Sequence, residues 1–416
     1  MAHQWFVGLD WSKSHHQICL LDRERQTRGE TVIPHSGAGF QQLATWLAEQ
    51  TQHAPPERIG IVLETSVGSV VQSCQTLGYQ VYAINPIQLD RFRDRHYPAG
   101  TKDDRRDALL LATALCLEPQ LVRQVEIEDE YTLQLRLRNR RRKAFVATRS
   151  ALITQMRTLL EEYFPSFETM FGDQLASPVA ATLWHRIPNP QTAHQTRLST
   201  VATILKKHRI RCVTAAAILE QLRAKPLPMP RYVVAARQQE VTMLWEHMRL
   251  VNQQIQTLDR QIAEQLDARV NAWDDIVDPA TEEPARPTDE AILASMPGIG
   301  NTVLATLLGE AGSVIRDRDY WALRCLTGVA PVTKSSGKYR RVQRRRTANK
   351  QLVDCVYHWG RVAMIIDPTC REKYRKLRAK GHTHGRALRS IVDRLLYVAC
   401  TMLNNRTLYQ KPLTES

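Results

Sequence analysis

Lys102-Asp103-Asp104-Arg105-Arg106-Asp107-Ala108 is the stretch that decides the fold, because it places two carboxylates three residues apart at the start of an apolar helix. The helix is predicted from the run 108–115, which holds strong helix formers after an acidic first turn. Residues three apart share a helix face, so Asp104 and Asp107 can be directed into one small volume. The simpler alternative is an acidic turn that complements the helix dipole.

Two predicted strands upstream of this helix also end in an acid. Buried strands are predicted over 6–10 and 59–64, which places Asp10 and Glu64 at their carboxyl ends. Further strands are predicted at 16–21, 30–33 and 79–84, with helices over about 39–49 and from the fourth strand to Leu77. If the first and fourth strands lie side by side, the strand-end acids and the facing helix converge.

Such a convergence of acids predicts a metal site. Carboxylates at Asp10, Glu64, Asp104 and Asp107 would repel one another unless a cation lay between them. Mg²⁺ or Mn²⁺ matches oxygen ligands, and two ions about 4 Å apart can hold both oxygens exchanged at a phosphodiester. Asp103 is the less favoured ligand, because it lies off the face of Asp104 and Asp107. The order D, E, DxxD resembles RNase H-like nucleases of the RuvC type.

The middle of the chain is predicted to be helical over 131–162 and 231–270, with a smaller helical insert at 177–229 between them. The second stretch carries an apolar seam in steps of three and four residues. The seam consists of Val241, Leu244, Met248, Val251, Ile255, Leu258 and Ile262. Two interpretations stay open: a helix hairpin within the chain, or a coiled coil between chains.

The positive charge is concentrated at the end of the chain. The net charge is +15, and residues 331–416 hold 20 Lys and Arg against 5 Asp and Glu, so the rest of the chain is neutral. Because this segment also has an apolar helical pattern, it should fold, and a folded basic domain indicates a nucleic-acid partner. We predict domains at 1–125, 126–270 and 288–416, with an acidic, proline-rich linker at 271–287.

Two motifs in the C-terminal domain indicate contact with phosphates. The turn Ser-Met-Pro-Gly-Ile-Gly at 295–300 lies between helical patterns, and Gly298 and Gly300 would let a phosphate approach backbone N–H groups. Ser336 precedes a glycine within a basic stretch, so its hydroxyl would meet a neutralised phosphate. Ser335 is an alternative nucleophile, and a simple turn is the alternative structure. Tyr339 is a rival nucleophile or a base-stacking side chain. The other expected phosphate contacts are Lys338, Arg340, Arg341, Arg344, Arg345 and Arg346.

The composition argues against secretion and membrane insertion. The eight cysteines are scattered without a CxxC pair, which is typical of reduced thiols in the cytoplasm. There is no signal-peptide pattern, and no apolar run approaches the roughly 18 residues of a membrane span. We therefore expect a cytoplasmic protein with no membrane partner.

The motifs together resemble a known family over nearly the whole chain. GLDWSK at the start, an acid after the fourth strand, KDDRRDA, a long helical middle, PGIG and GVAP…SSGKYRR…NK occur in this order. They resemble the insertion-sequence transposases with an N-terminal RuvC-like DEDD domain and a C-terminal serine transposase domain, also called bridge-RNA-guided recombinases. The chain departs from the family pattern at Asp103, where threonine is usual, and in its long 177–229 insert.

The resemblance implies a fold, a mechanism and a nucleoid-associated protein of a prokaryotic cell. The fold is an α/β RNase H-like (RuvC-like) N-terminal domain, a long helical or coiled-coil region, and a mainly α-helical C-terminal domain with a helix-hairpin-helix-like turn. Asp10, Glu64, Asp104 and Asp107 would bind metal, and Ser336 would be the nucleophile. Double-stranded donor and target DNA, a structured guide RNA and a dimer or tetramer with a composite site between protomers are the implied partners. The alternatives are a RuvC-like endonuclease without a covalent intermediate and a non-catalytic scaffold for nucleic acid.

Overall fold

The computed structural model describes residues 3–96, 103–127, 129–272, 286–336, 339–343 and 345–410. Of Lys334, Ser336 and Arg340 only the backbone is described. The chain divides into two compact units, Met1–Glu128 and Asp129–Ser416. In the described parts of both, no helix is long and apolar enough to cross a membrane.

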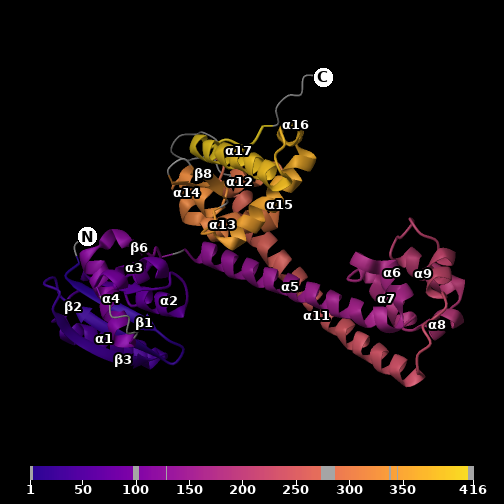
Figure 1. Ribbon diagram of the computed structural model, residues 1–416, viewed down its shortest axis with the longest axis horizontal. Helices are drawn as coiled ribbons and strands as arrows, with labels where there is room; N and C mark the ends of the chain where they lie inside the picture. The colour runs from indigo at the N-terminus through magenta and orange to yellow at the C-terminus, as the bar shows by residue number, and fades with distance from the viewer. Residues whose placement is uncertain are drawn as a thin grey trace. The chain divides into compact units, whose positions relative to one another are not determined.

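The first unit is built on a mixed sheet (Figure 1). Its described strands are β1 (Trp5–Trp11), β2 (His15–Leu21), β3 (Thr27–Pro34), β4 (Ile59–Leu63), β5 (Gln80–Ile84) and β6 (Val122–Gln124), in the order β3-β2-β1-β4-β5-β6. The first and fourth strands are parallel neighbours, with Gly8 opposite Val62, so the condition for the acids to converge is met. A mixed sheet with helices in this order is consistent with an RNase H-like fold.

Helices cover both faces of this sheet. Helices α1 (Gly37–Gln50) and α2 (Ser69–Thr76) bury one face, where Leu9 of β1 packs with Leu43 and Val71. On the other face, α3 (Pro86–His96) and α4 (Asp104–Leu117) pack against Val62 of β4 and Tyr82 of β5. The sequence predicted one helix after β5, whereas the structure has two, followed by β6. The three residues of β6 are too few for an alternation pattern to show.

Helix α4 lies backbone to backbone against β1. A Cβ atom on Gly8 would be 1.8 Å from the carbonyl oxygen of Ala108 and 2.7 Å from the amide nitrogen of Ala112. A Cβ atom on Gly60, which pairs with Phe6, would be 2.9 Å from the Leu115 side chain. Helix α4 therefore runs antiparallel to β1 and β4, with its N-terminus at their carboxyl ends.

Replacing Gly8 by alanine should destabilise the protein by at least about 1–3 kcal/mol, because the added methyl group meets backbone atoms that cannot rotate away. Gly37→Ala is the matched control, since a Cβ atom there meets nothing within 4 Å. Urea unfolding of the full chain measures the difference. Equal midpoints for the two variants would contradict the close approach of α4.

The second unit is organised by a helix hairpin. Helices α5 (Glu130–Tyr163) and α11 (Arg231–Val270) pack against each other within the chain. Val241, Met248 and Ile255 of the predicted seam are buried, so the seam is used inside the molecule. The two ends of the hairpin pack in two separate apolar cores. The start of α5 and the end of α11 contribute to one core, and the end of α5 and the start of α11 contribute to the other.

The core at the open end of the hairpin belongs to the C-terminal domain. It packs Leu135 and Leu266 of the hairpin against Trp359 and its neighbours. The elements are α12 (Asp289–Ala294), α13 (Asn301–Arg316), α14 (Tyr320–Leu326), β7 (Val332–Ser336), β8 (Tyr339–Gln343), α15 (Lys350–Ile366), α16 (Pro368–Ala379) and α17 (His384–Asn405). The predicted linker 271–287 lies largely outside the described residues, which break off between 272 and 286.

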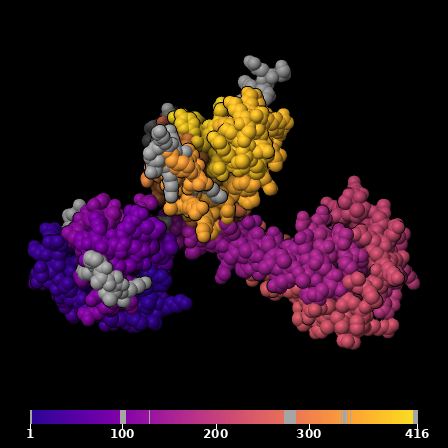
Figure 2. Space-filling view, in the orientation of Figure 1, coloured from indigo at the N-terminus to yellow at the C-terminus, as the bar shows by residue number. Residues whose placement is uncertain are grey.

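The core near the hairpin tip belongs to a small helical lobe, which we call the distal lobe. Its helices are α6 (Pro165–Phe171), α7 (Pro178–Arg186), α8 (Pro190–Gln195), α9 (Leu198–Lys207) and α10 (Ala215–Leu222). Trp184 and Phe167 meet edge to face in its centre and pack with Trp245 of α11. The lobe gathers around the tip where α5 ends and α11 begins (Figure 1), and its atoms form one compact mass there (Figure 2). It contains the insert predicted at 177–229.

Candidate functional site

The acidic residues of the first unit lie at the carboxyl edge of two neighbouring strands. Asp10 follows Gly8 by two residues in β1, so strand alternation places both on the face that α4 covers. Glu64 follows β4 directly, two residues after Val62, which packs on the same helix. Both carboxyl groups are half-buried. The ends of β1 and β4 and the start of α4 therefore lie at the same edge of the sheet, on the same face, as predicted.

The two acids of the helix differ in their surroundings. Asp107 is 5% exposed, and its Oδ1 accepts a hydrogen bond from Nη2 of Arg93 at 2.9 Å. Asp104, one turn earlier, is exposed. Asp103 is the N-cap of α4, and its side chain accepts a 3.4 Å hydrogen bond from the Arg105 amide. Capping accounts for Asp103 without a metal.

The acids do not form a closed metal cage. Among the described residues, no three His, Cys, Asp or Glu side chains lie close enough together to hold one ion. The donor set nevertheless fits a hard divalent cation, since it offers only carboxylate oxygens at one edge of the sheet. A divalent ion bound to Asp107 would compete with Arg93 for the same oxygen. The residues thus offer the donor atoms that the ion prefers, and they lie on the face of the sheet that α4 covers.

Arg93 is a site residue that the sequence analysis missed. It lies on α3, 14 residues from Asp107, and it also pairs with Asp90 at 2.8 Å. Its own sequence surroundings are an ordinary charged helix, so no local pattern marks it. Only the packing of α3 beside α4 brings the guanidinium to the carboxylate.

Replacing Arg93 by methionine should destabilise the protein by about 1–3 kcal/mol in EDTA, because the buried charge of Asp107 loses its partner. Mn²⁺ should restore more of the melting temperature in this variant than in the parent protein, since the ion no longer competes with arginine. Arg95→Met is the control, because Arg95 lies on the same helix as Arg93 and its ion pair with Glu118 is more exposed. Equal losses for both variants would contradict the assigned role of Arg93.

The candidate nucleophile lies at the end of a β-hairpin that the sequence analysis did not predict. Strands β7 and β8 are antiparallel, with Ser336 opposite Tyr339 at the closing pair. The intervening Gly337 and Lys338 lie outside the described residues, as does Arg344. A signal was present, since a two-residue loop that begins with glycine is typical of hairpins.

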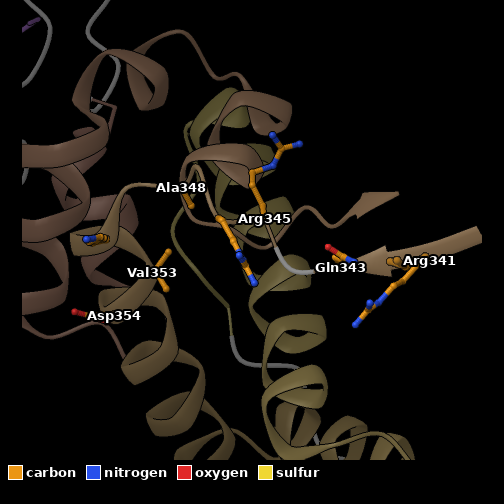
Figure 3. Close-up of a pocket in the computed structure, with 9 residues that line it drawn as sticks. Arg341, Gln343, Arg345, Ala348, Val353 and Asp354 are labelled. Carbon is orange, nitrogen blue, oxygen red and sulfur yellow. The ribbon is translucent and has the colours of Figure 1, made fainter. Parts of the chain in front are cut away.

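A basic cavity of about 740 Å³ lies between this hairpin and helix α15 (Figure 3). Arg345 lies in the segment that joins the end of β8 to the start of α15 (Figure 3). Its buried Nε has no hydrogen-bond partner among the described residues. The lining residues are Arg341, Val342, Gln343, Arg345, Arg346, Ala348, Lys350, Val353 and Asp354.

The cavity has a positive net charge, because its acidic lining residue already forms an ion pair with a lysine outside the cavity. Asp354, its acidic lining residue, is paired with Lys143 of α5 at 2.6 Å. Arg341, Arg346 and Lys350 are exposed at its edge. A phosphate oxygen would supply the acceptor that the Nε atom of Arg345 lacks. The arrangement is therefore suited to binding a phosphodiester.

The two glycines of the PGIG turn have different surroundings. Gly298 has φ +83°, and a Cβ atom there would lie 2.8 Å from the backbone nitrogen of Ala363 in α15. Trp359 of the same helix donates from Nε1 to the Pro297 carbonyl at 2.9 Å. Packing against α15 therefore explains Gly298. Gly300 has open space around it and precedes α13, so a phosphate could approach there.

An ion pair between a buried carboxylate and a partly exposed arginine fixes the start of α15 beside the cavity. Glu310 of α13 accepts two hydrogen bonds from Arg140, at 2.6 and 2.8 Å, and one at 3.0 Å from Asn349, the N-cap of α15. Burial alone would raise the pKa of Glu310, but the hydrogen bonds from Arg140 and Asn349 lower it overall below its ordinary value. The carboxylate thus joins α5, α13 and α15.

Because the pKa of Glu310 is lowered on folding, its contribution to stability is complete above its ordinary value of 4.5 and is lost as the pH falls further. The free energy of unfolding should therefore fall more steeply between pH 5 and 3 in the parent protein than in Glu310→Gln. Denaturant titrations at several pH values measure the two slopes. Parallel curves would contradict the assignment.

Comparison with known proteins gives two family matches. Residues 7–165 match a model for DEDD transposases of the IS110 group, and residues 290–375 match one described as the transposase IS116/IS110/IS902 family. The DEDD match indicates a requirement for a divalent metal. The first match contains all four predicted acids, and the second contains Ser336 and the basic cavity.

Individual relatives give the same result. The chain is 30% identical over 397 residues to a protein named as a mini-circle transposase for IS117 from Streptomyces coelicolor, covering 94% of this chain and 92% of that one. It is 36% identical over 206 residues to a protein named as transposase y4uE from Sinorhizobium fredii, which covers 50% of this chain and 57% of that protein. The insertion element IS110 protein of Streptomyces coelicolor is 24% identical over 97% of this chain and 95% of its own length.

Proposed function

The chain belongs to the IS110/IS116 family of insertion-sequence transposases, which are DNA recombinases, and we propose that it exchanges DNA strands through a phosphoserine linkage at Ser336. The observation that carries the proposal is the basic cavity beside the hairpin on which Ser336 lies. Four cationic residues line it, and its one acid is already paired with Lys143.

The proposed exchange conserves the number of phosphodiester bonds. The Ser336 hydroxyl loses its proton as its oxygen bonds to phosphorus, and a sugar oxygen leaves with a proton. A sugar hydroxyl of a second strand then attacks the phosphoserine, so the serine regains its proton and a new DNA bond forms. Neither step needs water or an external source of energy. Arg341, Arg345 and Arg346 would hold the phosphate oxygens during both steps.

We further propose that Asp10, Glu64, Asp104 and Asp107 hold Mg²⁺ or Mn²⁺. When bound, the ion would polarise a phosphate oxygen and stabilise the charge that develops on the exchanging oxygens. The support is the position of these carboxylates at one sheet edge, and the burial of Asp107. Before metal binding, Arg93 keeps the buried Asp107 carboxylate paired.

The DNA sites would be selected by a structured RNA encoded by the element, and the protein would work as a dimer or tetramer. Both proposals rest on the family resemblance. Purification after gentle lysis, followed by sequencing of bound RNA, tests RNA guidance. Full recombination by protein freed of RNA would contradict it.

Size-exclusion chromatography of active protein tests the oligomeric state. An active monomer would contradict the proposed dimer or tetramer.

Trapping of the covalent protein–DNA adduct tests the nucleophile. Ser336→Ala should lower the adduct yield by more than about a thousandfold, because the attacking oxygen is removed. Ser335→Ala is the matched control and should retain the adduct. An unchanged yield in Ser336→Ala would show that the nucleophile lies elsewhere. DNA ends with free 5′-phosphates and no adduct would instead identify a hydrolytic nuclease.

The metal proposal has its own test in the same assay. Asp107→Asn should abolish recombination in Mg²⁺ while leaving the fold intact, since asparagine keeps the size of the side chain and a partner for Arg93. Asp103→Asn is the control, because an asparagine caps a helix equally well. Full activity of Asp107→Asn would contradict the metal site, whatever the result for Ser336.

A further inference from the structure

We propose that the distal lobe carries a second nucleic-acid site, a groove between α7 and α9 with one arginine on its wall and four further cations beside it, which binds the phosphate backbone of duplex DNA. The groove has a volume of about 530 Å³ and is open to solvent. Its walls include His185 and Arg186 at the end of α7, and Thr200 and Thr203 of α9. It lies in a part of the chain that neither family match covers.

The cations of α9 continue this groove. Thr182 of α7 is hydrogen-bonded through Oγ1 to Nε2 of His208 at 2.9 Å, so the end of α9 lies against α7. Lys207 follows Thr203 by four residues and therefore extends the same helix face. Lys206 and Lys207 are exposed, as are Arg209 and Arg211 directly after the helix. Arg186 thus stands on one wall of the groove, and the other four cations lie where α9 ends.

These cations have no internal function that would explain them. In the described residues, Arg186, Lys206, Lys207, Arg209 and Arg211 form no ion pair. Two arginines elsewhere in or beside the lobe do have partners. Arg157 reaches Glu168 and Asp173, and Arg223 donates to the carbonyl groups of Ala193 and Thr196. The unpaired set is therefore available to an external anion.

Arg209 also occupies a backbone conformation that favours glycine. Its φ is +55° at the point where α9 ends, and the Ile210 amide bonds back to the Leu205 carbonyl. Arg25, Arg318 and Arg406 share this conformation, and the last two reach Asp289 with their guanidinium groups. Arg209 has no such acid. A strained position filled by a cation without an internal partner indicates a function for the side chain.

The side chains around the groove are suited to contacts with the phosphate backbone of DNA rather than with its bases. The aromatic side chains of helices α6 to α10, Phe167, Phe171 and Trp184, are buried, so none of them can stack on an unpaired base, whereas Tyr232 at the start of α11 is exposed. Cations with threonine hydroxyls are the typical contacts to phosphates of a duplex. Because transposases of this family act on DNA, duplex DNA is the partner that these features fit.

Cys212 offers a reporter beside the patch. All eight cysteines lie in the described residues, and Cys212 is the exposed one. A photo-crosslinker attached to Cys212 of the full chain should form an adduct with a random-sequence duplex of about 30 base pairs, and NaCl should suppress it steeply. Cys212→Ser controls for labelling elsewhere. Duplex binding in a gel shift without a cross-link from Cys212 would overturn the proposal.

Charge-reversal variants distinguish binding at the groove from the attraction of DNA to the net positive charge of the protein. Lys206→Glu with Lys207→Glu should lower the cross-link yield about tenfold or more, because two phosphate contacts become repulsive. Arg249→Glu with Arg260→Glu, exposed on α11, changes the net charge equally and should leave the yield within about twofold of the parent. Equal losses for both pairs would overturn the assignment. Duplex RNA or single-stranded DNA that cross-links as well as duplex DNA would overturn the choice of partner.

Arg209→Gly gives two readouts that move in opposite directions. Glycine relieves the left-handed backbone, so the melting temperature should rise. Loss of one phosphate contact should lower the slope of log Kd against log salt by about one. A variant that is more stable yet binds duplex DNA as tightly and with the same slope would contradict a role for Arg209 in binding.

Discussion

The direct contact of α4 with β1 at Gly8 is the constraint on which the acidic site depends. Two polypeptide backbones can come this close only where one residue lacks a side chain. The contact sets the height of α4 above the sheet, and with it the distance between Asp107 on the helix and Asp10 on the strand. A bulkier residue at position 8 would lift the helix and move one pair of acids away from the other.

The sequence predicted this unit well where the signals were local. Buried strands and amphipathic helices leave a period of two or 3.6 residues, so β1, β2, β4 and β5 were located to within one residue at each end. The start of α4 at Asp104 was predicted, but α3 was missed, because its charged sequence buries only Leu89 and Phe92 and so shows little apolar periodicity. The partnership of Arg93 and Asp107 is tertiary and leaves no local trace.

In the second unit the sequence left alternatives that only packing could resolve. An apolar seam does not state which helix it meets, and the structure pairs α11 with α5 of the same chain. The PGIG glycines looked equivalent as a motif, yet Gly298 is enclosed by α15 while Gly300 is open. The β-hairpin at Ser336 was overlooked because a run of arginines resembles a solvated loop more than a strand.

The hairpin of α5 and α11 gives the second unit a length that can change only in steps. With 34 and 40 residues, the helices extend about 50 and 60 Å at 1.5 Å per residue. A single inserted residue would rotate everything beyond it by about 100° and turn the seam toward solvent. Seven-residue insertions matched in both helices would preserve the seam and shift the lobe outward by about 10 Å. Related chains are thus free to differ in reach by whole heptads, but not by intermediate amounts.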